Sequence, residues 1–137
     1  MRFLLDTNVV SELRKRDRAD VGVQHWFRAT PDADIFLSVL VLGEIRQGVE
    51  RARRRDAKTA RHLEQWLRQL STAFTSRLLI VDAAVADQWG ALNARDPLPV
   101  VDGLLAATAL VHGLTVVTRN TEDFARTRVE MVNPFAH

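Results

Sequence analysis

Short apolar runs alternate along this chain with longer segments in which apolar residues recur every three or four positions. The runs occupy residues 2–5, 34–37, 78–81 and 115–118, and each is followed by polar or turn-forming residues. Brief apolar runs of this kind predict buried strands. A further strand is predicted at 128–132.

Helices are predicted between these strands, because the recurrence of apolar positions matches the 3.6-residue period of an α-helix. Ser38 and Asp82 stand immediately before such segments and are candidate N-caps, while Gly113 follows the last one, where glycine commonly ends a helix. The predicted helices cover residues 9–14, 39–49, 57–74, 83–94 and 101–111. Strands alternating with helices predict an α/β fold, with a central, mostly parallel sheet of about four to five strands flanked by helices on both faces.

The composition is that of an ordinary globular domain. The chain has 137 residues, of which 47% are hydrophobic and 26% are charged, so residues 1–137 are expected to form a single domain. No apolar stretch approaches the roughly 18–20 residues of a membrane span, and the first residues turn polar too soon for a secretory signal. With no cysteine in the chain, we expect a cytoplasmic protein that has no membrane partner.

Positive charge is concentrated in one part of the chain, although the formal net charge is only +2. Nearly all the basic residues are arginines, so the sequence pI of about 9.9 overstates the basicity. Residues 46–68 contain eight basic side chains against three acidic ones, an excess that fits a surface facing phosphates. The candidate contacts are Arg51, Arg53, Arg54 and Arg55. The alternative is an ordinary solvated helix surface.

Four acidic residues from distant parts of the chain are expected at one edge of the sheet. Asp6 ends the first strand and Asp123 follows a late one, so both fall at the carboxyl ends of strands, where such sheets bind ligands. Asp102 and Glu44 lie on helices that can lean over the same edge. Each residue has an ordinary alternative as a helix cap, a turn cap or a solvated carboxylate. If the four converge, their repulsion requires protonation or a cation, and oxygen ligands without cysteine favour Mg²⁺ or Mn²⁺ over zinc.

The sequence resembles the PIN-domain ribonucleases, and among them the VapC-type toxins of bacterial toxin–antitoxin pairs. The resemblance covers nearly the whole chain and rests on four segments in the family's order and spacing, FLLDTNVVSEL, LGEIRQGV, VVDGLLAATAL and VTRNTEDF. It implies a PIN-like fold, a divalent metal, endonucleolytic cleavage of RNA, a cognate antitoxin as partner, and a homodimer. By the same resemblance the acidic quartet is Asp6, Glu44, Asp102 and Asp123, with Thr118 and Asn120 as polar neighbours.

Phosphodiester hydrolysis assigns different expected roles to the four carboxylates. Asp6 and Asp102 are the expected direct metal ligands, and Asp123 is expected to bind a second metal or to act through water. Glu44 is the candidate for orienting or deprotonating the attacking water. Asn8 is expected to hold Asp6 in its rotamer.

The remaining polar and basic candidates are assigned to substrate and partner binding. Thr118 and Asn120 are expected to contact water or phosphate, and the arginines at 51–55 to contact RNA or the antitoxin. The non-enzymatic alternative is an RNA-binding module of the same fold, in which these arginines contact phosphates and the acids are structural.

Overall fold

The computed structural model describes residues 1–136, and His137, the last residue of the predicted domain, lies outside the described residues. Within residues 1–136, five strands form one all-parallel sheet in the order β3-β2-β1-β4-β5. The strands are β1 (Phe3–Leu5), β2 (Ile35–Ser38), β3 (Leu78–Leu79), β4 (Thr115–Val117) and β5 (Met131–Val132). The predicted α/β fold with a central parallel sheet is therefore confirmed.

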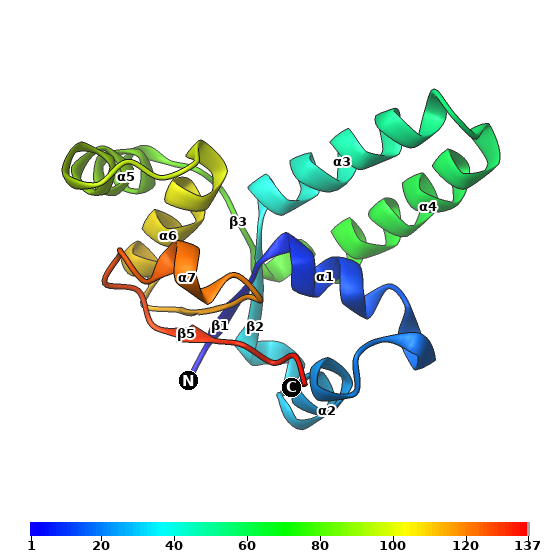
Figure 1. Cartoon of the computed structure of the whole chain (residues 1–137), viewed down its shortest axis with the longest axis horizontal. Coiled ribbons are helices and arrows are strands. Elements are labelled where there is room, and N and C mark those ends of the chain that lie inside the picture. Colours follow the sequence, from blue (N-terminus) through cyan, green and yellow to red (C-terminus); the bar gives the residue numbers. More distant parts are fainter. Residues whose placement is uncertain (137) are drawn as a thin grey trace.

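Seven helices accompany the sheet in the described part of the chain. Figure 1 places α1 to α4 on one side of the sheet and α5 and α6 on the other, with α3 and α4 forming a hairpin that reaches away from the strands. Right-handed crossovers explain this arrangement, because the chain moves outward from β1 to β3 over one face and returns to β4 over the other. The helices are α1 (Thr7–Leu13), α2 (Val21–Ala29), α3 (Val39–Arg53), α4 (Ala57–Ala73), α5 (Ala83–Arg95), α6 (Val100–His112) and α7 (Thr121–Phe124).

The ends of three helices lie at capping residues that can be recognised in the sequence. Ser38 Oγ accepts a hydrogen bond from the Leu40 backbone N–H at 3.0 Å, and Asp82 Oδ1 accepts one from the Val85 backbone N–H at 3.0 Å. Both predicted N-caps are therefore confirmed. Gly113 ends α6 in the left-handed region with φ 65°, which glycine adopts without a steric penalty.

The core lies on both faces of the sheet and is densest around its central strands. Leu4 and Leu5 of β1 and Val116 and Val117 of β4 are at most 1% exposed. Strands covered by helices on both faces need apolar residues at successive positions, which explains the unbroken apolar runs at 2–5 and 115–118. The helices contribute Val9, Val23, Val41, Val49, Ala60, Leu105 and Phe124 to the same core.

Two predicted strands are wrong in their extent. The run at 78–81 was expected to be buried throughout, but β3 contains only Leu78 and Leu79, both partly buried, while Ile80 is 62% exposed. β3 is the edge strand next to β2, so one of its sides has no neighbouring strand to cover it. The last strand likewise covers only 131–132 rather than 128–132.

Two helices have no counterpart in the sequence prediction. In α2 the residues Val23, Trp26 and Phe27 have the three-and-four spacing of a helix, and Asp20 caps it by accepting from the Val23 backbone N–H at 3.1 Å. Gly22 near its start weakens that signal. α7 is a single turn of four residues, too short for any periodicity to be visible.

The strand order fixes where the carboxyl ends gather. β1 pairs with β2 on one side and with β4 on the other, so the crossovers run in opposite directions from this point. Doubly wound sheets bind their ligands in the crevice at such a switch point. No helix among residues 1–136 is long and apolar enough to cross a membrane.

Candidate active site at the carboxyl edge of the sheet

Asp6 stands at the carboxyl end of β1, where its backbone N–H donates to the Val117 carbonyl oxygen of β4 at 2.9 Å. It is also the N-cap of α1, since Oδ1 accepts a hydrogen bond from the Thr7 backbone N–H at 2.8 Å. The helix-cap alternative is therefore true of this residue, but it accounts for only one carboxylate oxygen. Only 6% of Asp6 is exposed. Burial is the main reason why its pKa is raised, and the Glu44 charge raises it further.

The second oxygen of Asp6 is held by one side chain from the first turn of α1 and one from the segment after β4. Oδ2 accepts hydrogen bonds from Thr118 Oγ1 at 2.8 Å and from Asn8 Nδ2 at 3.3 Å. Thr118 Oγ1 in turn accepts from the Asn120 backbone N–H at 2.9 Å, and Asn8 Oδ1 accepts from the Arg119 backbone N–H at 3.1 Å. These bonds favour the charged carboxylate and tie the segment after β1 to the segment after β4. Asn120 enters this network through its backbone, and the residue is exposed.

Glu44 lies on α3, partly buried, and meets the same edge through a threonine that sequence reasoning missed. Thr7 Oγ1 donates a hydrogen bond to Glu44 Oε1, joining the first turn of α1 to α3. The sequence offers only a weak signal for this contact, because a threonine that follows an N-cap aspartate is common at the start of any helix.

Asp102 lies in the first turn of α6, partly buried, and its pKa is raised to about 6. Burial is the largest cause, followed by the negative charges of Asp6, Asp123 and Glu44. An effect of one charge on another falls off with distance and with screening. The charges of the other three carboxylates therefore reach Asp102, and the charge of Glu44 also reaches Asp6. A common catalytic site for the four stays a prediction.

Asp123 is the most open member of the quartet. It is exposed on α7, and its backbone N–H donates to the Asn120 carbonyl oxygen at 3.1 Å. Among residues 1–136, no three His, Asp or Glu side chains lie close enough together to hold a metal ion in this conformation. The charges of Asp6, Glu44 and Asp123 thus act on Asp102, but the four carboxylates do not form a closed group of metal ligands in the described residues.

Comparison with known proteins places this geometry in a family. A profile of the PIN domain matches residues 3–130. The chain belongs to the PIN-domain family. The toxin FitB of Neisseria gonorrhoeae is 32% identical over 97% of this chain and 98% of its own length. A VapC ribonuclease of Sinorhizobium fredii, Y4jK, is 31% identical over 97% of each chain.

Solved structures of PIN-domain complexes have the same fold. A chain of the FitAcB crystal structure from Neisseria gonorrhoeae matches with a TM-score of 0.86 and 33% identity, covering 96% of this chain and 97% of its own. A chain of FitAB bound to a DNA fragment matches with a TM-score of 0.85 and 31% identity, covering 98% of this chain and 96% of its own. The PIN-like fold expected from the sequence is confirmed.

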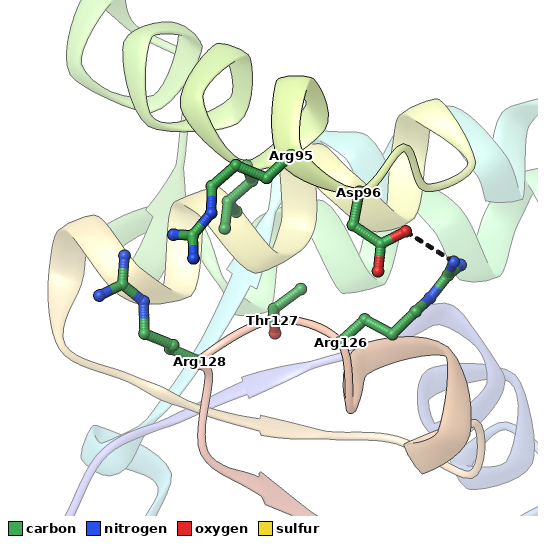
Figure 2. A pocket seen from close by; sticks show the side chains of 6 residues that line it. Arg95, Asp96, Arg126, Thr127 and Arg128 are labelled. Carbon is green, nitrogen blue, oxygen red and sulfur yellow. Dashed lines mark hydrogen bonds and ion pairs between the residues drawn. The ribbon is translucent and has the colours of Figure 1, made fainter.

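The PIN domain also carries a basic cluster that sequence reasoning missed. Arg95, at the end of α5, lines one pocket together with Arg126 and Arg128 of the segment between α7 and β5 (Figure 2). The sequence gives no run of basic residues here, because the three arginines come from two segments about 30 residues apart.

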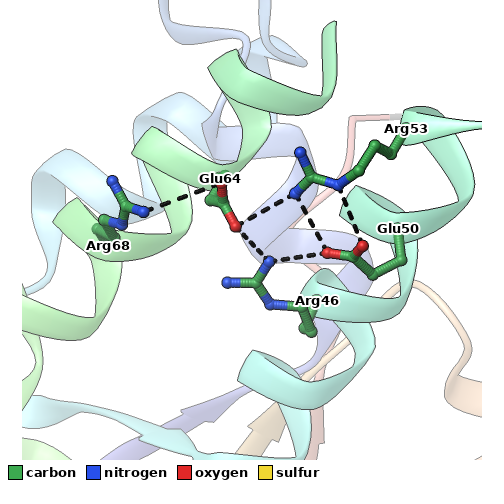
Figure 3. Close-up of polar contacts among 5 residues, drawn as sticks. All are labelled: Arg46, Glu50, Arg53, Glu64 and Arg68. Atoms are coloured by element: carbon green, nitrogen blue, oxygen red, sulfur yellow. Dashed lines mark hydrogen bonds and ion pairs between the residues drawn. The ribbon is translucent and has the colours of Figure 1, made fainter. Parts of the chain in front are cut away.

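The basic segment that the sequence did single out lies on the α3–α4 hairpin of the PIN domain, and three of its eight basic side chains form ion pairs within residues 1–136. Arg46 Nη1 lies 2.9 Å from Glu50 Oε2 and 2.6 Å from Glu64 Oε2, and Arg53 pairs with the same two carboxylates at 3.1 and 3.2 Å (Figure 3). Arg68 completes the network at 3.9 Å from Glu64. Because Glu50 and Glu64 are already among the three acids counted for this segment, the excess of basic over acidic side chains in residues 46–68 remains.

The predicted RNA contacts at 51–55 stand at the far end of α3. With a rise of about 1.5 Å per residue, Arg53 lies about 14 Å along the helix from Glu44. Arg51 and Arg53 also occupy the last turn of α3, where basic side chains stabilise the helix dipole. A role for Arg51, Arg53, Arg54 and Arg55 in binding RNA or an antitoxin stays a prediction, and Arg53 also pairs with Glu50 and Glu64.

Proposed function

We propose that this PIN domain is a metal-dependent endoribonuclease that hydrolyses RNA phosphodiester bonds and acts as the toxin of a toxin–antitoxin pair. The supporting observation is the mutual effect of carboxylates near the switch point: together with burial, the negative charges of Asp6, Asp123 and Glu44 raise the pKa of Asp102 to about 6. Relatives that cover almost the whole chain and are named VapC ribonuclease and FitB toxin support the same function.

The residues at this edge fit a divalent cation. The side chains that stabilise the Asp6 carboxylate are neutral, and within residues 1–136 the charges that shift the pKa of Asp102 are all negative. A cation would relieve a repulsion that nearby arginines leave uncompensated. Mg²⁺ is commonly bound by one or two carboxylates and keeps several waters, so the donors agree with Mg²⁺ or Mn²⁺ although the described residues form no closed group of three.

In this proposal Asp6 and Asp102 would hold the ion, and Asp123 would hold a second ion or act through water. A bound divalent ion supplies a lowered pKa of its water and charge neutralisation at the phosphate. Asp6 is suited to this role because Thr7, Thr118 and Asn8 fix both of its oxygens, and Oδ1, which accepts only one of these hydrogen bonds, keeps a further lone pair.

Glu44 is proposed to accept the proton of the attacking water. Its Oε1 is occupied by the Thr7 hydroxyl, which fixes the orientation of the carboxylate. No hydrogen bond to Oε2 is formed within residues 1–136, so Oε2 is the atom that is free to take the proton. Thr7 therefore acts as a positioning residue for Glu44.

The test is cleavage of single-stranded RNA by the purified protein, with Mg²⁺ and with EDTA. Asp6→Asn and Asp102→Asn are expected to lose activity with the fold retained, and Glu44→Gln to lose roughly 10²–10⁴-fold in kcat. Asp87→Asn, an exposed change on α5, is the matched control and should cleave like the wild type. Full activity in Asp6→Asn or Asp102→Asn would remove that residue from the site. RNA binding that persists in EDTA, with no cleavage under any condition, would favour the RNA-binding module.

A toxin role gives a second readout. Solved relatives include the complex FitAB and a toxin–antitoxin complex from Klebsiella pneumoniae, which supports an antitoxin as the partner of this chain. Expression of the wild type is expected to arrest bacterial growth, whereas Asp6→Asn is not, and sequencing of RNA ends in both cultures would identify the cleaved RNA. A homodimer stays a prediction, which light scattering of the purified protein would test.

A further inference from the structure

A small basic pocket lies between the end of α5 and the segment that follows α7. It has a volume of about 280 Å³ and is lined by Leu92, Arg95, Asp96, Arg126, Thr127 and Arg128. This is just below the range of pockets that take drug-sized ligands, and its lining is mostly polar and charged rather than apolar. The pocket therefore suits a small charged group better than a base or a cofactor ring.

The charges in this pocket are unbalanced. Asp96 Oδ1 pairs with Arg126 Nη1 at 2.9 Å, which ties the end of α5 to the segment after α7. Arg95 and Arg128 form no ion pair within residues 1–136, and Figure 2 shows both guanidinium groups on the side of the pocket away from the Asp96–Arg126 pair. The three arginines and one aspartate leave a net charge of +2, so the pocket favours an anion.

The backbone that carries two of these arginines is held in place. Thr127 Oγ1 donates to the Phe124 carbonyl oxygen at 2.7 Å and accepts from the Val129 backbone N–H at 3.2 Å. Phe124 and Val129 are buried, so this short segment is anchored at both ends. Arg126 and Arg128 therefore project from a backbone that is already ordered, so the binding of an anion there costs less conformational entropy of the protein.

Two short segments of chain connect the pocket to the acidic edge. Arg128 lies five residues after Asp123, which limits the separation of their Cα atoms to about 18 Å, and Arg95 lies seven residues before Asp102, within about 25 Å. A stacked strand advances about 3.4 Å per nucleotide, so the two places are at most about five to seven nucleotides apart. The acidic quartet repels phosphates, and a strand that crosses it needs positive groups beside it.

We propose that Arg95 and Arg128, supported by the Asp96–Arg126 pair, form a subsite for a backbone phosphate of single-stranded RNA a few nucleotides from the cleavage point. The inference rests on the proposed function, because it takes RNA as the ligand. It adds a location on the path by which the RNA strand leaves the active site. Two guanidinium groups on one phosphate give charge-assisted hydrogen bonds without reading the base, so the subsite positions any sequence.

The test measures RNA binding separately from cleavage. Fluorescence anisotropy of a labelled single-stranded RNA of about 12 nucleotides is recorded in EDTA over a range of salt concentrations. The variant is Arg95→Gln with Arg128→Gln. The matched control is Arg18→Gln with Arg28→Gln, which removes the same charge from exposed residues beside and on α2.

The subsite variant is expected to bind RNA about tenfold more weakly, and its log–log salt dependence is expected to be shallower by about 0.7, the value for one lost phosphate contact on a single strand. With Mg²⁺, KM should rise by a similar factor while kcat is unchanged, because neither arginine touches the reacting bond. The control pair should match the wild type in affinity, salt slope and KM.

Three outcomes would overturn the inference. Unchanged RNA affinity and salt slope in the subsite variant would remove the phosphate contact. Unchanged RNA affinity with lost binding of polyglutamate would assign the pocket to an acidic protein segment. An equal loss of RNA affinity in the control pair would show that the effect comes from the lower net charge of the protein and not from this pocket. If the wild type binds RNA and the variant binds it less well but neither cleaves, the nuclease proposal fails and the subsite stands.

Discussion

Asp102→Asn is expected to make the metal-free protein more stable at neutral pH while it abolishes RNA cleavage. Burial and the charges of three other carboxylates oppose ionisation of Asp102 in the folded protein and raise its pKa from 3.8 to about 6. Between these two values the folded protein binds more protons than the unfolded chain, so this contribution to stability is present at low pH and is lost as pH rises towards 6. Asparagine carries no charge at any of these pH values.

The magnitude is limited by the exposure of the side chain. The full rise in pKa corresponds to about 3 kcal/mol. Because Asp102 is partly exposed, solvent screening reduces that figure, and asparagine also loses the roughly 0.3–1 kcal/mol that a first-turn carboxylate gains from the helix N-terminus. A net gain of about 1 kcal/mol raises Tm by about 3–4 °C in a domain of this size.

The assay is calorimetric unfolding in EDTA at about pH 7.5 and about pH 4, values on either side of the shifted pKa. Asp102→Asn should melt above the wild type only at the higher pH, and Asp87→Asn, the exposed control on α5, should melt with the wild type at both. Mg²⁺ should then raise the Tm of the wild type more than that of Asp102→Asn. A variant that is destabilised at about pH 7.5, or stabilised equally at both pH values, would refute the electrostatic reasoning.

Three further changes test other parts of the structure. Gly22→Ala should lower the free energy of unfolding, measured in urea, by about 1–3 kcal/mol, because the added Cβ would lie 2.4 and 2.7 Å from two backbone atoms of the C-terminal segment. Gly90→Ala on α5 is the control: its Cβ meets open space, so this change should be neutral or stabilising. Glu64→Gln should reduce stability only slightly, and the difference should disappear in about 1 M NaCl, since its three arginine partners are exposed. Thr118→Val removes the 2.8 Å hydrogen bond to Asp6 and should lower the free energy of unfolding by about 1.5–3 kcal/mol. It should also raise the pKa of Asp6 further and so move the acid limb of the pH profile of cleavage to higher pH. Thr118→Ser keeps the hydroxyl and should behave like the wild type.

The central strands could be predicted because their signals are local. A buried parallel strand must be apolar at successive positions, so the runs ending at Asp6 and before Thr118 are visible without any tertiary information. Once the alternation of strands and helices is recognised, the carboxyl ends of the strands share one edge, so the sequence also predicts that Asp6, Asp102 and Asp123 lie near that edge. Local caps such as Ser38 also follow from neighbouring residues alone.

Contacts between distant residues were decided only by the tertiary structure. Ile80 is as apolar as its neighbours but is exposed because β3 became the edge of the sheet. The charge of Arg46 and Arg53 appears free in the sequence, yet packing of α4 against α3 supplies Glu64 as a partner for both. The Thr7 contact that orients Glu44 likewise joins residues 37 positions apart. Sequence periodicity reports which face of an element is buried, whereas the partner of each polar side chain depends on how whole elements pack.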